Sequence, residues 1–378
     1  MLRADFASRA GTIWRSEQQF RADDNGVIDL AKMPPLSGPY DEADPMGIFW
    51  SMQNSKERSS DGLTFDNDDY SVVSLILRDG EKTLAQHYTI LRNRQIGVST
   101  TEVRGDVTGT FLSPAVQKRV PGVIVLGGSE GGTPRAYAAL IASHGFPTLS
   151  LGYFAMEDLP ADLERIPLET VDRGVEWLAK QPNVDPKRIV VLGMSKGAEL
   201  ALAAAAKNPR IKAVIAIAPS SVVFEGISNG KTPLSSWTAG GKDLTFAPYV
   251  KTDDYAKSHW LIDLYDPSFD KAPSEAAIEV ERIAGPILLI SGKSDMLWPS
   301  ARMANQMAAR LSAKHFRYKV LNRQWDEVGH HVAGVPMRPT VDSVRLGGTA
   351  RTIAKAQLEA WREMINFLTE LGQPNKRK

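Results

Sequence analysis

The sequence predicts a β-sandwich domain followed by a doubly wound α/β domain whose sheet is mostly parallel. The chain has 378 residues, which exceeds one typical domain and fits two. Before about residue 115, short runs of alternating polarity are separated by turn residues. After about residue 120, a buried strand, a glycine turn and a helix follow one another repeatedly. We therefore expect one domain over residues 1–115 and a second over residues 116–378.

The predicted sandwich contains a β-hairpin. Residues 70–77 and 83–91 alternate in polarity and flank an Asp-Gly turn at Asp79, which is typical of a hairpin. Residues 96–104 form a further predicted strand. Residues 20–115 show no helical periodicity, and several short strands without helices favour a sandwich.

The second domain is predicted from strands that are apolar throughout and that alternate with helices. Such strands belong to a parallel sheet that is covered on both faces. The predicted strands span residues 123–126, 146–151, 188–192, 213–217 and 286–290, and the predicted helices span residues 134–144, 169–180, 198–207 and 354–371. Residues 221–284 break the alternation with aromatic side chains among glycines and prolines. This insert is either a lid or substrate wall, or an apolar cluster beneath a loop, and both interpretations stay open.

Composition excludes several classes of protein. The 45 Lys and Arg residues nearly cancel the 44 Asp and Glu residues, so no strong field attracts nucleic acid or an anionic membrane. The absence of cysteine excludes disulfides, a thiolate nucleophile and cysteine-ligated zinc. No apolar run is long enough to span a membrane, and the first residues lack the apolar stretch of a signal peptide. We therefore expect a cytoplasmic protein that acts on a small molecule.

The motif Gly-x-Ser-x-Gly occurs twice, around Ser195 and around Ser129. The nucleophile elbow of an α/β hydrolase needs a strand, a sharp turn and an immediate helix. Ser195 has an apolar strand before it and an alanine-rich helix after it. We therefore predict that Ser195 is the nucleophile and that the backbone N–H of Lys196 donates to the oxyanion. The loop of Gly128 and Ser129 follows the first strand of the domain, where this fold supplies its second oxyanion N–H; the reverse assignment of the two serines stays open.

A serine hydroxyl becomes a good nucleophile when an imidazole takes its proton and a carboxylate orients that imidazole. In this fold the three residues occur in the order serine, acid, histidine. Asp295 closely follows the predicted strand at residues 286–290, at the end of a strand where catalytic groups gather. An ordinary loop aspartate is its alternative interpretation. His330 and His331 lie in a loop after a predicted strand at residues 318–321, and spacing alone does not choose between them.

The sequence predicts no metal site and no cofactor. His330 and His331 are adjacent, so their side chains diverge on a helix or strand, and no His-Glu-x-x-His pattern exists. The sequence contains no Gly-x-x-x-x-Gly-Lys-Ser/Thr motif, and the glycines before Ser129 lack the Gly-x-Gly-x-x-Gly spacing that dinucleotides require.

Several longer motifs carry a family resemblance. In the first domain they are Trp14-Arg15-Ser16, Phe20-Arg21-Ala22-Asp23, Gly26-Val27-Ile28-Asp29-Leu30 and Asp44-Pro45-Met46-Gly47-Ile48-Phe49-Trp50-Ser51-Met52. In the second they are Gly127-Gly128-Ser129-Glu130-Gly131-Gly132, Ile166-Pro167-Leu168-Glu169, Gly193-Met194-Ser195-Lys196-Gly197-Ala198-Glu199-Leu200, Ser235-Ser236-Trp237 and Leu297-Trp298-Pro299-Ser300. With these motifs, the chain resembles the acyl-CoA thioester hydrolase/bile acid-CoA:amino acid N-acyltransferase family over nearly its whole length.

The resemblance implies an N-terminal immunoglobulin-like sandwich and a C-terminal α/β-hydrolase domain that cleaves fatty acyl-CoA to free fatty acid and CoA without a cofactor. The Gly-His motif of the family falls on Gly329 and His330, which favours His330 over His331 as the base. Members that transfer acyl groups to amino acids typically use a cysteine nucleophile. This chain has Ser195 at that position, which favours hydrolysis.

The chain departs from the family at two places. Related chains have two or three further strands before the segment that matches Trp14, so we expect an N-terminally incomplete sandwich. The small Gly-Ala-Gly-His turn of the family here reads Glu327-Val328-Gly329-His330. A carboxylesterase, an N-acyltransferase and a non-catalytic binding protein on the same scaffold remain alternatives. The sequence indicates neither the acyl chain length nor the oligomeric state.

Overall fold

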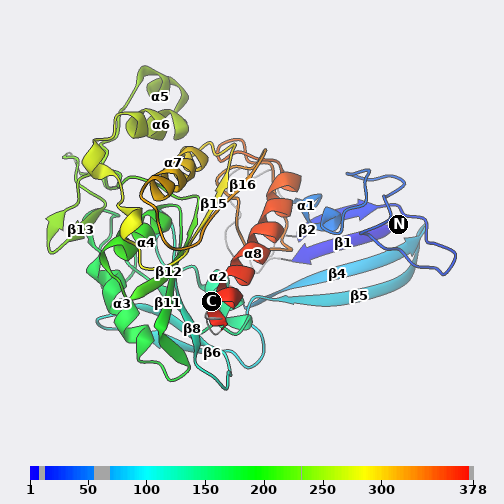
Figure 1. Cartoon of the computed structure of the whole chain (residues 1–378). Helices are drawn as coiled ribbons and strands as arrows, with labels where there is room; N and C mark the ends of the chain where they lie inside the picture. Colours follow the sequence, from blue (N-terminus) through cyan, green and yellow to red (C-terminus); the bar gives the residue numbers. More distant parts are fainter. Residues whose placement is uncertain (8–12, 55–68, 231, 374–378) are drawn as a thin grey trace.

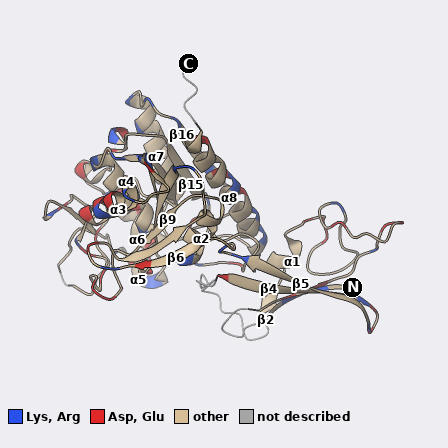
Figure 2. Ribbon diagram, turned by 90° about the horizontal axis from the view of Figure 1, so that it is seen from below, with Lys and Arg blue, Asp and Glu red and all other residues tan. Residues whose placement is uncertain are grey.

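The computed structural model describes residues 1–7, 13–54, 69–230 and 232–373. Two large β-sheets organise this part of the chain, and the smaller sheet extends away from the larger domain in both views (Figures 1 and 2). Basic and acidic residues are interspersed along the ribbon in Figure 2, in keeping with the balanced charge of the sequence. Among the described residues, no helix is both long enough and apolar enough to cross a membrane.

The smaller sheet is antiparallel and has the strand order β3-β2-β1-β4-β5. Its strands are β1 (Leu2–Ala7), β2 (Ile13–Gln18), β3 (Gln53–Asn54), β4 (Tyr70–Asp79) and β5 (Lys82–Arg92). The pairing of β4 with β5 confirms the predicted hairpin. The described strands form one layer, so the two-layer immunoglobulin-like sandwich stays a prediction.

The larger sheet has the strand order β16-β15-β12-β11-β8-β9-β7-β6. Its strands are β6 (Ser99–Val103), β7 (Gly109–Ser113), β8 (Val120–Leu126), β9 (Thr148–Leu151), β11 (Val184–Met194), β12 (Ile211–Ile217), β15 (Ile287–Gly292) and β16 (Val320–Trp325). The neighbouring strands in the series β16-β15-β12-β11-β8-β9 all pair in parallel. Strand β7 pairs antiparallel with both β6 and β9. The prediction of a mostly parallel sheet is therefore confirmed.

The strands β6 and β7, which lie before the predicted domain boundary at residue 115, belong to the larger sheet. An antiparallel edge strand is half exposed and alternates in polarity, so its pattern matches that of a sandwich strand. The alternation near residues 96–104 therefore could not reveal which sheet the strand joins. We propose that the first domain ends within residues 93–98, between β5 and β6.

Helices cover both faces of the larger sheet, as Figure 1 shows. The helices α3 (Glu169–Ala179), α4 (Lys196–Lys207) and α7 (Ser300–Ala313) bury apolar residues in the core on one face. The helices α2 (Arg135–Ser143) and α8 (Ala350–Gly372) do so in the core on the other face. Neighbouring residues of β11 point into opposite cores, Val191 into the first and Leu192 into the second. This two-sided burial explains why the strands are apolar throughout.

Helix α8 also contacts the smaller sheet. Leu358 packs against the apolar core of that sheet, which includes residues of the short helix α1 (Gly47–Trp50). The guanidinium of Arg351 lies 6.0 Å from the centre of the Trp50 ring, and it pairs with Glu42. One helix thus joins the cores of both sheets.

The predicted insert folds mainly as short elements. These are β13 (Trp237–Ala239) and β14 (Lys242–Asp243), which form a small sheet with β10 (Ile166–Pro167), the helices α5 (Asp253–Ser258) and α6 (Ile262–Asp270), and two 3-10 turns at Ser274–Ala276 and Val280–Arg282. Phe224 and Tyr265 of the insert form an apolar cluster with Trp298 and Met303. An apolar cluster is therefore present, and the role of the insert as a lid or substrate wall stays a prediction.

We expect Leu368→Ala in α8 to lower the free energy of unfolding by about 2–5 kcal/mol, because Leu368 is fully buried between α8 and the larger sheet. Chemical denaturation followed by circular dichroism measures this change. Leu371→Ala is the control, since Leu371 is only partly buried and should cost clearly less. Equal losses in the two variants would contradict this account of the packing of α8.

Candidate active site

The turn between β11 and α4 holds Ser195 in an unusual backbone conformation. Strand β11 ends at Met194, helix α4 begins at Lys196, and Ser195 between them has φ 55° and ψ −122°. A positive φ is strained for a residue with a side chain and persists only where surrounding contacts enforce it. One such contact is the hydrogen bond from the Ser195 N–H to the Ile217 carbonyl, at 2.9 Å. The predicted strand, sharp turn and immediate helix are all present.

Glycines make this turn possible. A Cβ atom on Gly193 would lie 2.0 Å from the carbonyl oxygen of Gly197, and a Cβ on Gly197 would lie 2.1 Å from the carbonyl oxygen of Gly127. Real Cβ atoms do not approach backbone oxygens so closely. The glycines of the motif therefore permit the close packing of β11, α4 and the loop after β8.

The structure brings Ser195, His330 and Asp295 into one hydrogen-bonded line. His330 Nε2 lies 2.9 Å from Ser195 Oγ, and His330 Nδ1 lies 2.9 Å from Asp295 Oδ2. The side chain of Asp295 is 2% exposed and that of His330 is 9% exposed. A neutral imidazole that donates from Nδ1 to Asp295 keeps Nε2 free to accept the serine proton. Ser195, and not Ser129, is the serine that contacts His330.

Asp295 is held by three further hydrogen bonds in the loop between β15 and α7. Its Oδ1 accepts from the backbone N–H groups of Leu297 at 3.0 Å and Trp298 at 3.3 Å. Its Oδ2 accepts from the hydroxyl of Ser300 at 2.6 Å. These bonds fix the carboxylate that faces His330. Sequence reasoning did not assign a role to Ser300, although Ser300 lies in one of the family motifs.

Trp298 supports the imidazole from the side. Its ring centre lies 5.8 Å from that of His330, in an edge-to-face arrangement, and its indole N–H donates to the Ala218 carbonyl at 3.2 Å. The backbone N–H of His330 donates to the Leu346 carbonyl at 2.8 Å. Packing and backbone bonding therefore both restrict the position of His330.

His331 differs from His330 in its surroundings. Burial, with a smaller effect of the neighbouring His330, lowers the pKa of His331 from 6.5 to about 4. His331 is therefore neutral at pH 7. The structure places His330 and not its neighbour between the serine and the aspartate.

The predicted oxyanion donors lie around Ser195 but differ in their availability. The Lys196 N–H lies in the first turn of α4, where no intrahelical acceptor exists. Gly128 is close to the nucleophile, since a Cβ on it would lie 3.2 Å from Ser195 Cβ. The Gly128 N–H, however, donates to Glu130 Oε1 at 2.9 Å. The Gly128 N–H thus has an acceptor within its own loop, and its role as an oxyanion donor stays a prediction.

The hydroxyl of Tyr153 binds the loop of Gly127 and Gly128. Its hydroxyl is 2.7 Å from the Gly127 carbonyl oxygen and 3.0 Å from the Gly128 carbonyl oxygen. Burial raises the pKa of Tyr153 well above its usual value, so the hydroxyl stays protonated and can donate. Both carbonyls are thereby directed toward Tyr153, and Ser129 remains exposed at the tip of the loop. In the described part of the chain, no three His, Asp or Glu side chains are grouped as metal ligands.

Two family models match the chain. The model described as "BAAT / Acyl-CoA thioester hydrolase C terminal" matches residues 166–373, and the model described as "Acyl-CoA thioester hydrolase/BAAT N-terminal region" matches residues 1–105. The first match alone covers more than half of the chain.

Curated relatives are similar over almost the full length. Mouse acyl-coenzyme A thioesterase 6 is 30% identical over 389 residues, covering 97% of this chain and 88% of the relative. Mouse peroxisomal succinyl-coenzyme A thioesterase is 28% identical, covering 100% of this chain and 91% of the relative. Human mitochondrial acyl-coenzyme A thioesterase 2 is 28% identical, covering 97% of this chain and 77% of the relative.

We expect Gly193→Ala to lower the free energy of unfolding by at least about 1–3 kcal/mol and to displace Ser195, because the added methyl group meets a backbone oxygen. Thermal unfolding and the labelling rate of Ser195 by a fluorophosphonate measure the two effects. Gly372→Ala is the matched control, since its Cβ would lie 3.8 Å from the nearest atom. Unchanged labelling of Gly193→Ala would show that the close approach does not shape the elbow.

We expect stability to depend on pH through His331. A folded-state pKa of about 4 against an ordinary value of 6.5 means that the unfolded chain binds the proton first as the pH falls. The wild type should therefore lose stability between pH 6.5 and pH 4, and His331→Gln should lose less over the same range. Urea midpoints at several pH values measure the difference between the two proteins. Parallel curves would show that His331 is not buried in its neutral form.

Proposed function

Since this chain belongs to the acyl-CoA thioester hydrolase/BAAT family, we propose that it hydrolyses fatty acyl-CoA to free fatty acid and CoA through an acyl-enzyme on Ser195. The observation that carries this proposal is the continuous line of hydrogen bonds from Ser195 through His330 to Asp295. The relatives above are named as acyl-coenzyme A or succinyl-coenzyme A thioesterases, which supports coenzyme A thioesters as the substrate class.

In the proposed acylation step, Ser195 Oγ attacks the thioester carbonyl while His330 Nε2 takes the hydroxyl proton. Asp295 accepts from Nδ1–H and stabilises the imidazolium that forms. The N–H groups of Lys196 and Ser129 then donate to the oxyanion of the tetrahedral intermediate. The C–S bond breaks and CoA leaves as a thiolate. A thiolate is a better leaving group than an alkoxide, so this step needs little help from a general acid. The imidazolium of His330 then passes the serine proton to the departed CoA thiolate, which becomes the free thiol.

In the proposed deacylation step, the neutral His330 acts as a general base again. It takes a proton from a water molecule, whose oxygen attacks the acyl-serine ester. The ester C–O bond breaks, Ser195 regains its proton, and the fatty acid is released. An oxygen ester on serine is less reactive toward amines than a thioester on cysteine, which favours water over an amino acid as the acceptor.

We further propose that the smaller sheet is one layer of an immunoglobulin-like sandwich. The family match over residues 1–105 supports this assignment. One face of the sheet carries a row of paired apolar residues across four strands, Ile13, Ala7, Val72 and Ile90. Ile13 is 43% exposed and Ile90 is 47% exposed, so this row is open in the described part of the chain. A second layer of strands would cover it.

We expect Ser195→Ala to retain less than about 1% of the wild-type rate of thiol release from acyl-CoA, because it removes the nucleophile. A thiol-trapping dye measures CoA release over a series of acyl chain lengths. Ser129→Ala is the matched control, since it keeps the backbone N–H that the mechanism uses and should retain most of the activity. Activity of Ser195→Ala above about 1% would overturn the mechanism.

The same preparation separates the alternatives. Hydrolysis of p-nitrophenyl esters without CoA release from any acyl-CoA would indicate a carboxylesterase. Acyl-glycine or acyl-taurine, detected by mass spectrometry when the amine is supplied, would indicate an N-acyltransferase. Failure of a fluorophosphonate to label Ser195 would indicate a binding protein.

A further inference from the structure

A fully buried ion pair lies directly behind the nucleophile. The side chains of Lys196 and Glu199 are 1% and 0% exposed, and Lys196 Nζ lies 2.9 and 2.8 Å from the two carboxylate oxygens. Burial lowers the pKa of Lys196 and raises the pKa of Glu199, and the attraction within the pair opposes both shifts. Removal of two charges from water is costly, and apolar residues often serve stability as well or better. The mechanism above uses neither side chain.

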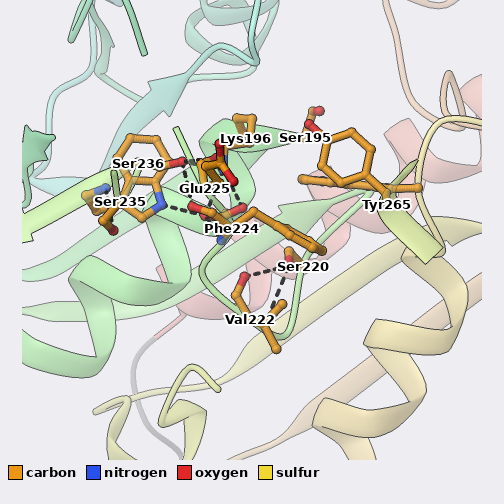
Figure 3. A network of polar contacts seen from close by, with 12 residues as sticks. Ser195, Lys196, Ser220, Val222, Phe224, Glu225, Ser235, Ser236 and Tyr265 are labelled. Carbon is orange, nitrogen blue, oxygen red and sulfur yellow. Dashed lines mark hydrogen bonds and ion pairs between the residues drawn. The ribbon is translucent and has the colours of Figure 1, made fainter. Parts of the chain in front are cut away.

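The remaining bonds of the pair all reach the insert. Lys196 Nζ donates to the hydroxyl of Ser236 at 2.7 Å, and Figure 3 shows Lys196 between Ser195 and Ser236. Glu199 Oε1 accepts from the backbone N–H of Phe224 at 3.0 Å and from the indole N–H of Trp237 at 2.7 Å. The Ser236 hydroxyl in turn reaches the Phe224 carbonyl oxygen at 2.9 Å. Two segments of the insert are thus bound to the first turn of α4.

Phe224 and Trp237, which bind Glu199, also pack against other parts of the site. The Phe224 ring stacks on Trp298 at 5.9 Å, and Trp298 packs against His330. The Trp237 ring lies 6.0 Å from that of Tyr153, whose hydroxyl holds the loop of Gly127 and Gly128. The ion pair is therefore linked to three parts of the site: the turn at Ser195, Trp298 beside His330, and the loop of Gly127 and Gly128.

We propose that Glu199 is a positioning residue for the reaction: through its ion pair with Lys196 it anchors the insert on the elbow and thereby fixes the Lys196 N–H and Ser195 for the transition state. Glu199 acts through the residue that follows the nucleophile and does not touch the reacting atoms. This inference rests on the proposed function, since the positioned N–H is the proposed oxyanion donor.

Glu199→Gln tests the proposal. The amide can still accept from Trp237 and Phe224, but it loses the charge that holds Lys196. We expect kcat for acyl-CoA to fall at least about tenfold with KM within about twofold, because loss of one oxyanion donor lowers kcat by about 10²–10³. The rate at which a fluorophosphonate labels Ser195 should fall in parallel, since its tetrahedral adduct places an oxygen at the oxyanion position.

Two variants keep the ion pair and weaken only its link to the insert. Ser236→Ala removes the acceptor of Lys196, and Trp237→Phe removes the indole donor to Glu199. Both should lower kcat and the labelling rate, by less than Glu199→Gln does. Glu370→Gln is the control, because Glu370 pairs with Lys319 on the exposed surface and should leave both rates unchanged.

The outcomes separate the interpretations. A pair with only a structural role would lower the unfolding midpoint of Glu199→Gln and leave kcat per labelled Ser195 at the wild-type value, which overturns the proposal. If Glu199→Gln does not fold, wild-type labelling rates in both Ser236→Ala and Trp237→Phe overturn it. If the wild type is labelled at Ser195 but releases no thiol, the proposed function fails, and the labelling rates alone decide the role of Glu199.

Discussion

The close approach of three backbone segments around Ser195 is the constraint on which the site depends. Strand β11, helix α4 and the loop after β8 meet where a single added methyl group would collide with a carbonyl oxygen. This packing forces Ser195 to a positive φ and points the first turn of α4 at the same place. The strain at one residue is thus maintained by contacts distributed over three elements. The proposed nucleophile and the proposed oxyanion donor are adjacent because one turn produces both.

The parallel sheet assembles the rest of the site from distant parts of the chain. His330 is 135 residues from Ser195 and 35 residues from Asp295 in sequence. Each of the three residues follows the carboxyl end of a different strand, β16, β11 and β15. Because parallel strands end at one edge of the sheet, these loops converge without any local sequence contact. The hydrogen bonds from the loop around Ser300 then hold the buried carboxylate of Asp295 so that it faces the imidazole.

Sequence reasoning reached the elements whose signals are local. The apolar strands, the hairpin around Asp79 and the turn at Ser195 each have a pattern within about ten residues, and the structure contains all of them. It did not assign β6 and β7 to the larger sheet, because alternating polarity does not tell which sheet an edge strand joins. It also missed the bond between Gly128 and Glu130, which depends on side-chain rotation. The contacts of Glu199 with Phe224 and Trp237 span 25 and 38 residues, and no spacing rule connects them.

Helix α8 has a consequence for how the protein forms during synthesis. It covers one face of the larger sheet and also supplies Leu358 to the core of the smaller one. The strands of the smaller sheet leave the ribosome before those of the larger one, yet their core is in contact with Leu358 of α8, which follows all of these strands. The smaller sheet therefore waits for the whole larger domain before its packing is complete. A nascent chain that has not yet produced α8 therefore leaves an apolar surface uncovered on each sheet.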